Sequence, residues 1–143
     1  MGSTTLVRGA LSGLLAAVVM NLPMLAQRDG YLPAYVAAGA TSGRDPTRVP
    51  TRDAAIAHHV AGALAGVLSV LLARPVAKLA GERIGGAVAV VGVVAFVDAF
   101  FSRIVFSLRG GEIVADDDRA RGVRDGWRRS TLVYGLVLWL ARP

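Results

Sequence analysis

The chain has no cysteine among its 143 residues. Disulfides, zinc–thiolate sites, iron–sulfur clusters and cysteine nucleophiles are therefore excluded. Aromatic residues are also few, at 6%, and charged residues make up 18% of the chain, below the roughly 25% that is usual for soluble domains. The charges are clustered, and several windows have none. This distribution is typical of a membrane protein.

What the chain has in abundance is apolar and basic residues. Hydrophobic residues make up 54%, and the mean hydropathy is +0.52. The net charge is +6, and Lys78 is the single lysine among 16 basic residues, an arginine bias that we attribute to a GC-rich prokaryotic genome. The basic residues flank the apolar segments, so we interpret them as orienting the protein and contacting anionic lipid headgroups. We expect no nucleic-acid partner and no cofactor.

Four apolar segments predict an all-α fold, a bundle of four transmembrane helices in one membrane domain covering residues 1–143. The predicted helices cover about residues 6–27, 54–79, 84–108 and 127–142. The first and second segments hold 19 and 20 consecutive uncharged residues, or about 28–30 Å of helix, enough for the hydrocarbon core. A tight connector around Gly81 separates the second and third.

Two of these segments leave an alternative open. The first could be a signal peptide, with Arg8 ahead of the apolar run and a weak cleavage site before Gln27. The fourth has only twelve uncharged residues, about 18 Å of helix. It spans a membrane if Arg128 and Arg129 snorkel to the interface; otherwise it lies on the membrane surface.

The connectors predict how the protein is oriented. Residues 28–52 contain a stretch at 32–40 that is too short to span and suits an interfacial helix. Residues 112–129 carry charges of both signs and predict a solvated loop. The two long connectors hold ten basic residues and the opposite side five. The positive-inside rule then places both long connectors in the cytoplasm and both termini outside a plasma membrane.

Glycine spacing predicts how two helices pack. Gly9 and Gly13 form a G-x-x-x-G pattern in the first segment, and Gly62 and Gly66 form another in the second. Residues four apart share a helix face, and glycines there let another backbone approach closely. General richness in small residues would also produce such matches.

Polar residues inside the segments gather in one leaflet. Asn21 lies about 9 Å, and His58 and His59 about 6–8 Å, inside the side of the long connectors. Asp98 lies about 21 Å from the opposite side, so it is about 9 Å from this one. Ser102 and Arg103 lie further out in the same direction. The leaflet near the termini is expected to be dry.

Two interpretations fit this polar cluster. In the functional one it is a vestibule that binds a small ligand or relays protons, with Asp98 as a buried acid and Arg103 or a histidine as its partner. In the structural one these groups only hydrogen-bond neighbouring helices or reach the headgroups. A metal site is not expected, because adjacent histidines point about 100° apart on a helix.

The order of features resembles a loose set of small four-helix membrane proteins of bacteria and archaea for which no activity is established. Gly9, Gly13 and Met20 match its first helix, and His59, Gly62 and Gly66 match its second. The resemblance implies the fold and no mechanism.

Three functions are therefore left open. The first is a non-catalytic accessory or assembly protein that associates through helices, in a homo-oligomer or a larger membrane complex. The second is a small transporter or a proton or ion pathway. The third is an intramembrane enzyme, for which we find no recognisable catalytic spacing.

Overall fold

The computed structural model describes residues 2–103 and 117–141, and the regular structure in these ranges is helical. Its α-helices are α1 (Ser3–Leu25), α2 (Leu32–Ser42), α3 (Thr51–Ala80), α4 (Glu82–Phe100) and α6 (Asp117–Ala141), with a short 3₁₀ helix at Pro46–Arg48. The prediction of an all-α protein is confirmed. Three stretches are long and apolar enough to cross a membrane, namely Ser3–Leu25, Thr51–Ala80 and Glu82–Arg103.

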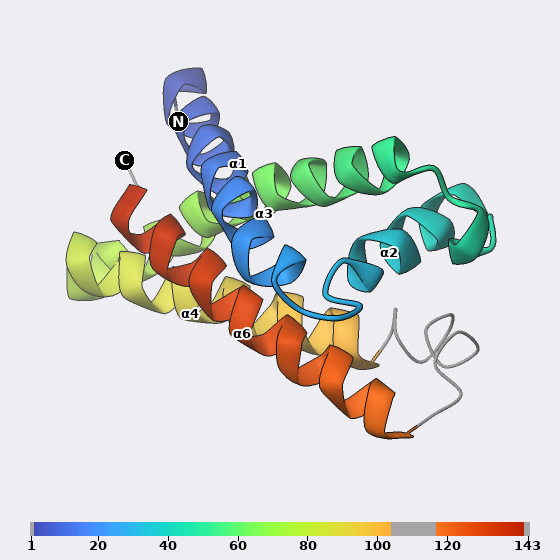
Figure 1. Ribbon diagram of the computed structural model, residues 1–143. Helices are drawn as coiled ribbons and strands as arrows, with labels where there is room; N and C mark the ends of the chain where they lie inside the picture. Colours follow the sequence, from blue (N-terminus) through green and yellow to red (C-terminus); the bar gives the residue numbers. More distant parts are fainter. Residues whose placement is uncertain (1, 104–116, 142–143) are drawn as a thin grey trace.

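The four long helices form a bundle in which each packs against two others. Helix α1 packs against α3 and α6, and α4 packs against the same two helices from the other side. Figure 1 shows both ends of the chain at the end of the bundle where α3 turns into α4. The short helix α2 packs mainly on α3, toward the opposite end.

Small residues fill the inside of this bundle, and large apolar residues cover its outside. On α1 the buried positions are Gly9, Ser12, Gly13, Ala16, Ala17, Met20 and Met24. Each long helix exposes bulky aliphatic side chains, for example Leu22 (71% exposed), Leu64 (64%), Val91 (68%) and Leu132 (66%). In water this arrangement would leave a large apolar surface unburied. In lipid the same surface is solvated, and small interior residues allow close helix contact.

Local chemistry explains how the helices end. Helix α2 stops at Gly43, whose φ of 68° is the left-handed conformation that glycine adopts without strain. Between α3 and α4 there is a single residue, Gly81, with a φ of 89°. A side chain would be strained there, so glycine is what makes this connector tight.

The largest difference from the sequence expectation concerns α6. Residues 117–126, expected to be a solvated loop, are the first turns of this helix. Asp117 and Asp118 lie in its first turn, where negative charge is favoured by the helix dipole. Arg121 pairs with Asp118 three residues earlier, a spacing that places both side chains on one helix face. The high density of charge in residues 117–126 predicts a loop, whereas in the structure these charges stabilise the start of a helix.

Other boundaries differ by a few residues. Helix α1 starts and ends earlier than expected, at Ser3 and Leu25. Helix α3 begins at Thr51 and continues through Pro75 to Ala80. A short helix was expected at 32–40, and α2 occupies that stretch. The expected end of the third segment, at 104–108, and residue 142 lie outside the described residues.

Candidate functional site

The glycines of α1 and α3 lie directly against each other. A Cβ atom built on Gly13 would stand 2.7 Å from Cα of Gly66 and still closer to the carbonyl oxygen of Gly62. A Cβ on Gly66 would likewise stand 2.7 Å from Cα of Gly13, and one on Gly9 would stand 3.0 Å from the carbonyl oxygen of Gly66. Because backbone atoms are on both sides of this contact, no side chain can move to make room. The glycine faces of α1 and α3 therefore pack against each other inside the bundle.

Asn21 and the two histidines form one polar group at the contact of α1 with α3. Nδ1 of His59 lies 2.7 Å from the carbonyl oxygen of Ala55 and donates to it. This leaves Nε2 of His59 as the acceptor for Nδ2 of Asn21, at 3.1 Å. His58 is buried, and its Nε2 donates to the carbonyl oxygen of Ala17 at 3.3 Å. Each histidine therefore joins helices or satisfies a backbone carbonyl.

Asp98 lies elsewhere, on α4, facing α6. Its ion pair is with Arg128, at 3.6 Å between Nε and Oδ2, and not with Arg103 or a histidine, so the expected partners are wrong. The Asp98 side chain is 29% exposed and that of Arg128 61% exposed. The other oxygen, Oδ1, is buried and has no hydrogen-bond partner in the described part of the chain.

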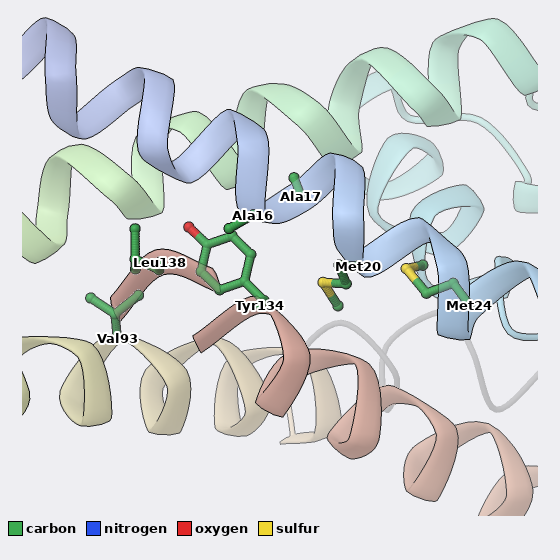
Figure 2. Close-up of a cluster of buried hydrophobic side chains, with 7 residues drawn as sticks. All are labelled: Ala16, Ala17, Met20, Met24, Val93, Tyr134 and Leu138. Atoms are coloured by element: carbon green, nitrogen blue, oxygen red, sulfur yellow. The ribbon is translucent and has the colours of Figure 1, made fainter. Parts of the chain in front are cut away.

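The expected polar cluster is therefore split into two groups. The Asp98–Arg128 pair lies in a groove between α4 and α6, whereas His58 lines a cleft between α2, α3 and α4. A buried hydrophobic cluster occupies the interior and includes residues of α1, α4 and α6, drawn in Figure 2: Ala16, Ala17, Met20, Met24, Val93, Tyr134 and Leu138. Ser102 is partly buried and Arg103 is exposed, near the end of α4.

Hydroxyl groups make further ties between the helices. The Tyr134 hydroxyl donates to the carbonyl oxygen of Gly62 at 2.8 Å, across the bundle from α6 to α3. The Ser12 hydroxyl donates to the carbonyl oxygen of Ala141 at 2.6 Å, which joins α1 to the end of α6. Sequence reasoning missed both ties because it ranked ionisable groups above hydroxyls. The hydrogen bond of Tyr134 could have been expected, because this residue lies within an uncharged stretch, where its hydroxyl needs a partner on a neighbouring helix.

Polar residues also line a cavity at the end of the bundle where α3 turns into α4. A cavity of about 580 Å³ opens at this end between the four long helices. Its lining includes three hydroxyl residues and three charged ones, namely Thr5, Ser12, Ser69, Arg74, Glu82 and Arg83. Polar groups therefore line both ends of the bundle, although the three charged ones at this end lie outside the uncharged stretches of α3 and α4.

A salt bridge on the side of the long connectors fastens α6 to the α1–α2 turn. Arg119 donates to both carboxylate oxygens of Asp29, at 2.7 and 2.8 Å. This hydrogen bonding lowers the pKa of Asp29 below its ordinary value of 3.8. Asp29 also adopts a left-handed conformation, with a φ of 59°, which aspartate tolerates better than most residues. Nearby, burial raises the pKa of Tyr31.

No group of three histidine or carboxylate side chains that could hold a metal ion occurs in residues 2–103 and 117–141. Compared with known protein families, with curated proteins and with solved structures, the chain matches none.

Proposed function

We propose that the protein crosses the membrane four times and that α6 is the fourth crossing. Helix α6 runs antiparallel to α1, because Gly126 lies against Gln27 and Ala141 against Ser12. These contacts are 15 residues apart along each segment, and Gln27 lies two residues past the end of α1, so the two helices share about 20 Å of length. Leu132, Leu136 and Leu140 form an exposed stripe on α6 at four-residue spacing, as expected for a lipid-facing side.

The basic residues support one orientation in a plasma membrane. With four crossings, the two long connectors lie on one side and carry ten basic residues, against five on the side of the termini. The positive-inside rule then places the connectors in the cytoplasm and the termini outside.

For its activity we propose association rather than turnover: an accessory or assembly protein that binds another membrane protein or a second copy of itself. The hydrogen bonds that the intramembrane polar groups make support this proposal. Asn21, His58 and Tyr134 all bond to a neighbouring helix. Polar groups used in this way fix helices to one another and leave little for chemistry.

A cleft between α3 and α4 offers a surface for such association. The two helices are joined by one residue and diverge toward α2 (Figure 1), leaving an apolar cleft of about 310 Å³. Phe96 and Phe100 stack at 5.8 Å between ring centroids and are 56% and 45% exposed beside it. A ridge of aliphatic side chains on another membrane helix is the occupant that suits this apolar lining.

Purification in mild detergent followed by native mass spectrometry tests the association. We expect a homo-oligomer or a complex with a larger membrane protein. Phe96→Ala combined with Phe100→Ala should dissociate it, whereas Leu22→Ala, at a more exposed apolar position on α1, should not. A monomer that forms no complex in detergent and shows no crosslinks in native membranes would contradict the proposal.

A transporter or proton pathway is the second candidate, and the unpartnered Oδ1 of Asp98 favours it. The hydrophobic cluster of Figure 2 fills the bundle interior between α1, α4 and α6, which argues for association instead. Asp98→Asn in proteoliposomes separates the two. A flux that is present in the native protein and lost in the variant would favour transport.

A further inference from the structure

The four helices do not offer the same height of apolar surface to a membrane. Between charged residues, α1 has 19 uncharged residues and α3 has 20, whereas α4 has 14 from Ile84 to Val97 and α6 has 12 from Ser130 to Ala141. These stretches correspond to about 28 and 30 Å for the first pair, and to about 21 and 18 Å for the second. Measured only between charged residues, the α4–α6 side is therefore about 10 Å shorter than a hydrocarbon core of about 30 Å, and the stretch Glu82–Arg103 reaches the length of a full crossing only with Asp98 inside it.

The two short stretches are bounded by charged residues at the same height of the bundle. Asp98 follows the last uncharged residue of its stretch on α4, and Arg128 lies two residues before Ser130 on α6. These two charges form the ion pair between the helices. The pair therefore places two charges inward from the Arg103 end of the stretch Glu82–Arg103, between α4 and α6. Lipids at such a face respond by thinning, which brings headgroups toward the charges.

An apolar groove begins at this ion pair. It has a volume of about 630 Å³ and extends along α4 from Asp98 to Ala87 and along α6 from Arg128 to Trp139. Each side covers 12 residues, a rise of about 16 Å from the first to the last, close to half of the 30 Å hydrocarbon core. The groove therefore matches the length of an acyl chain in one leaflet. A partner helix that crosses the bilayer would need twice this length.

The charged end of the groove has the chemistry of a headgroup site. The exposed guanidinium of Arg128 is a good donor to a phosphate. The buried Oδ1 of Asp98 has no donor from the described residues, and a buried acceptor left in this way is costly. A headgroup that combines a phosphate with a hydroxyl donor would satisfy both residues at once.

We propose that the α4–α6 groove binds a phospholipid with a hydroxyl-bearing headgroup, such as phosphatidylglycerol. The phosphate binds Arg128, a headgroup hydroxyl donates to the partly exposed carboxylate of Asp98, and one acyl chain lies along the groove. The site rests on the proposed fourth crossing, since only then does the groove face lipid. It is a separate surface from the α3–α4 cleft.

Native mass spectrometry of the detergent-solubilised protein tests the site, with phosphatidylglycerol compared against phosphatidylcholine of the same acyl chains. Phosphatidylcholine has the phosphate and no headgroup donor, so we expect weaker binding. Arg128→Gln should lower phosphatidylglycerol affinity about tenfold, the effect of losing one charge-assisted hydrogen bond. Arg129→Gln is the matched control, with the same charge change outside the groove lining, and should have less than a twofold effect.

Further measurements separate the parts of the proposal. Ala95→Phe fills the groove from an exposed position and should abolish lipid retention without unfolding the protein. Asp98→Asn should reduce the preference for phosphatidylglycerol over phosphatidylcholine.

Equal binding of both lipids, or no effect of Arg128→Gln, would overturn the site. Competition by soluble glycerol phosphate would show a free-anion site and would overturn the groove assignment. Release of the protein from membranes by alkaline washing would instead refute the membrane crossing.

Discussion

The contact between the glycines of α1 and α3 makes the sharpest prediction about stability. In the Gly13→Ala variant the new Cβ would lie 2.7 Å from Cα of Gly66, whereas carbon atoms prefer about 3.5–4.0 Å. Relief of this overlap requires α1 and α3 to separate by about 1 Å. A gap of that size removes about a quarter to a half of the dispersion energy of each atom pair involved.

We expect Gly13→Ala to lower the free energy of unfolding by about 1–3 kcal/mol, as for other overpacked sites. Helix propensity works in the opposite direction, because alanine is favoured over glycine by about 0.5–1 kcal/mol in a helix. The hydrogen bond from His58 to Ala17, already 3.3 Å long, also crosses the contact between α1 and α3 and would lengthen. The overlap therefore outweighs the gain in propensity.

Unfolding by sodium dodecyl sulfate in mixed micelles, followed by circular dichroism or tryptophan fluorescence, measures the difference. Gly92→Ala is the matched control, because a Cβ on Gly92 meets nothing within 4 Å and the variant should be as stable as the native protein or slightly more. If Gly13→Ala is as stable as Gly92→Ala, the two backbones are not in contact and the packing described here is wrong.

Three further predictions follow from the ties between helices. Tyr134→Phe removes the hydrogen bond to Gly62 and should cost about 0.6–1.5 kcal/mol in the same unfolding assay; unchanged stability would show that the hydroxyl is not bonded to α3. Asp29→Asn should remove up to about 1 kcal/mol at neutral pH, since its pair with Arg119 is partly exposed and screened. Because the folded-state pKa of Asp29 is lowered, this contribution is full above 3.8 and is lost as the pH falls through the lowered pKa. Stability measured from pH 7 to pH 3 should therefore fall less steeply in Asp29→Asn than in the native protein, and identical slopes would contradict the assignment. For the orientation, a reporter enzyme active only outside the cytoplasm should be active when fused to the C-terminus, and an inactive fusion that is stably produced would reverse the topology.

The parts of this structure that sequence could predict are those set by local spacing. Four residues make about one helical turn, so Gly9 and Gly13 could be placed on one face without knowing what meets that face. The apolar segments of α1, α3 and α4 hold uncharged runs of 19, 20 and 14 residues, and their helical nature follows from that length.

The sequence could not predict which residues pair when they lie far apart along the chain. Asp98 and Arg128 are 30 residues apart, and nothing in either local pattern favours Arg128 over Arg103 as the partner. The early start of α6 had a readable signal, because Ala120, Val123 and Gly126 recur at helical spacing and are buried. The surrounding charge concealed this pattern, since charge density was weighed above periodicity.

The single residue between α3 and α4 has a consequence for how the protein enters a bilayer. Gly81 leaves no length of chain between the two helices, so their backbones must turn together. In the proposed four-crossing arrangement, α3 and α4 would therefore enter the bilayer as one helical hairpin, with the direction of α4 set by that of α3. Helix α6, with its twelve uncharged residues, has the weakest insertion signal of its own. As the proposed fourth crossing, it would enter against a surface that α1 and the hairpin have already formed, so the bundle would assemble in sequence rather than by independent insertion of each helix.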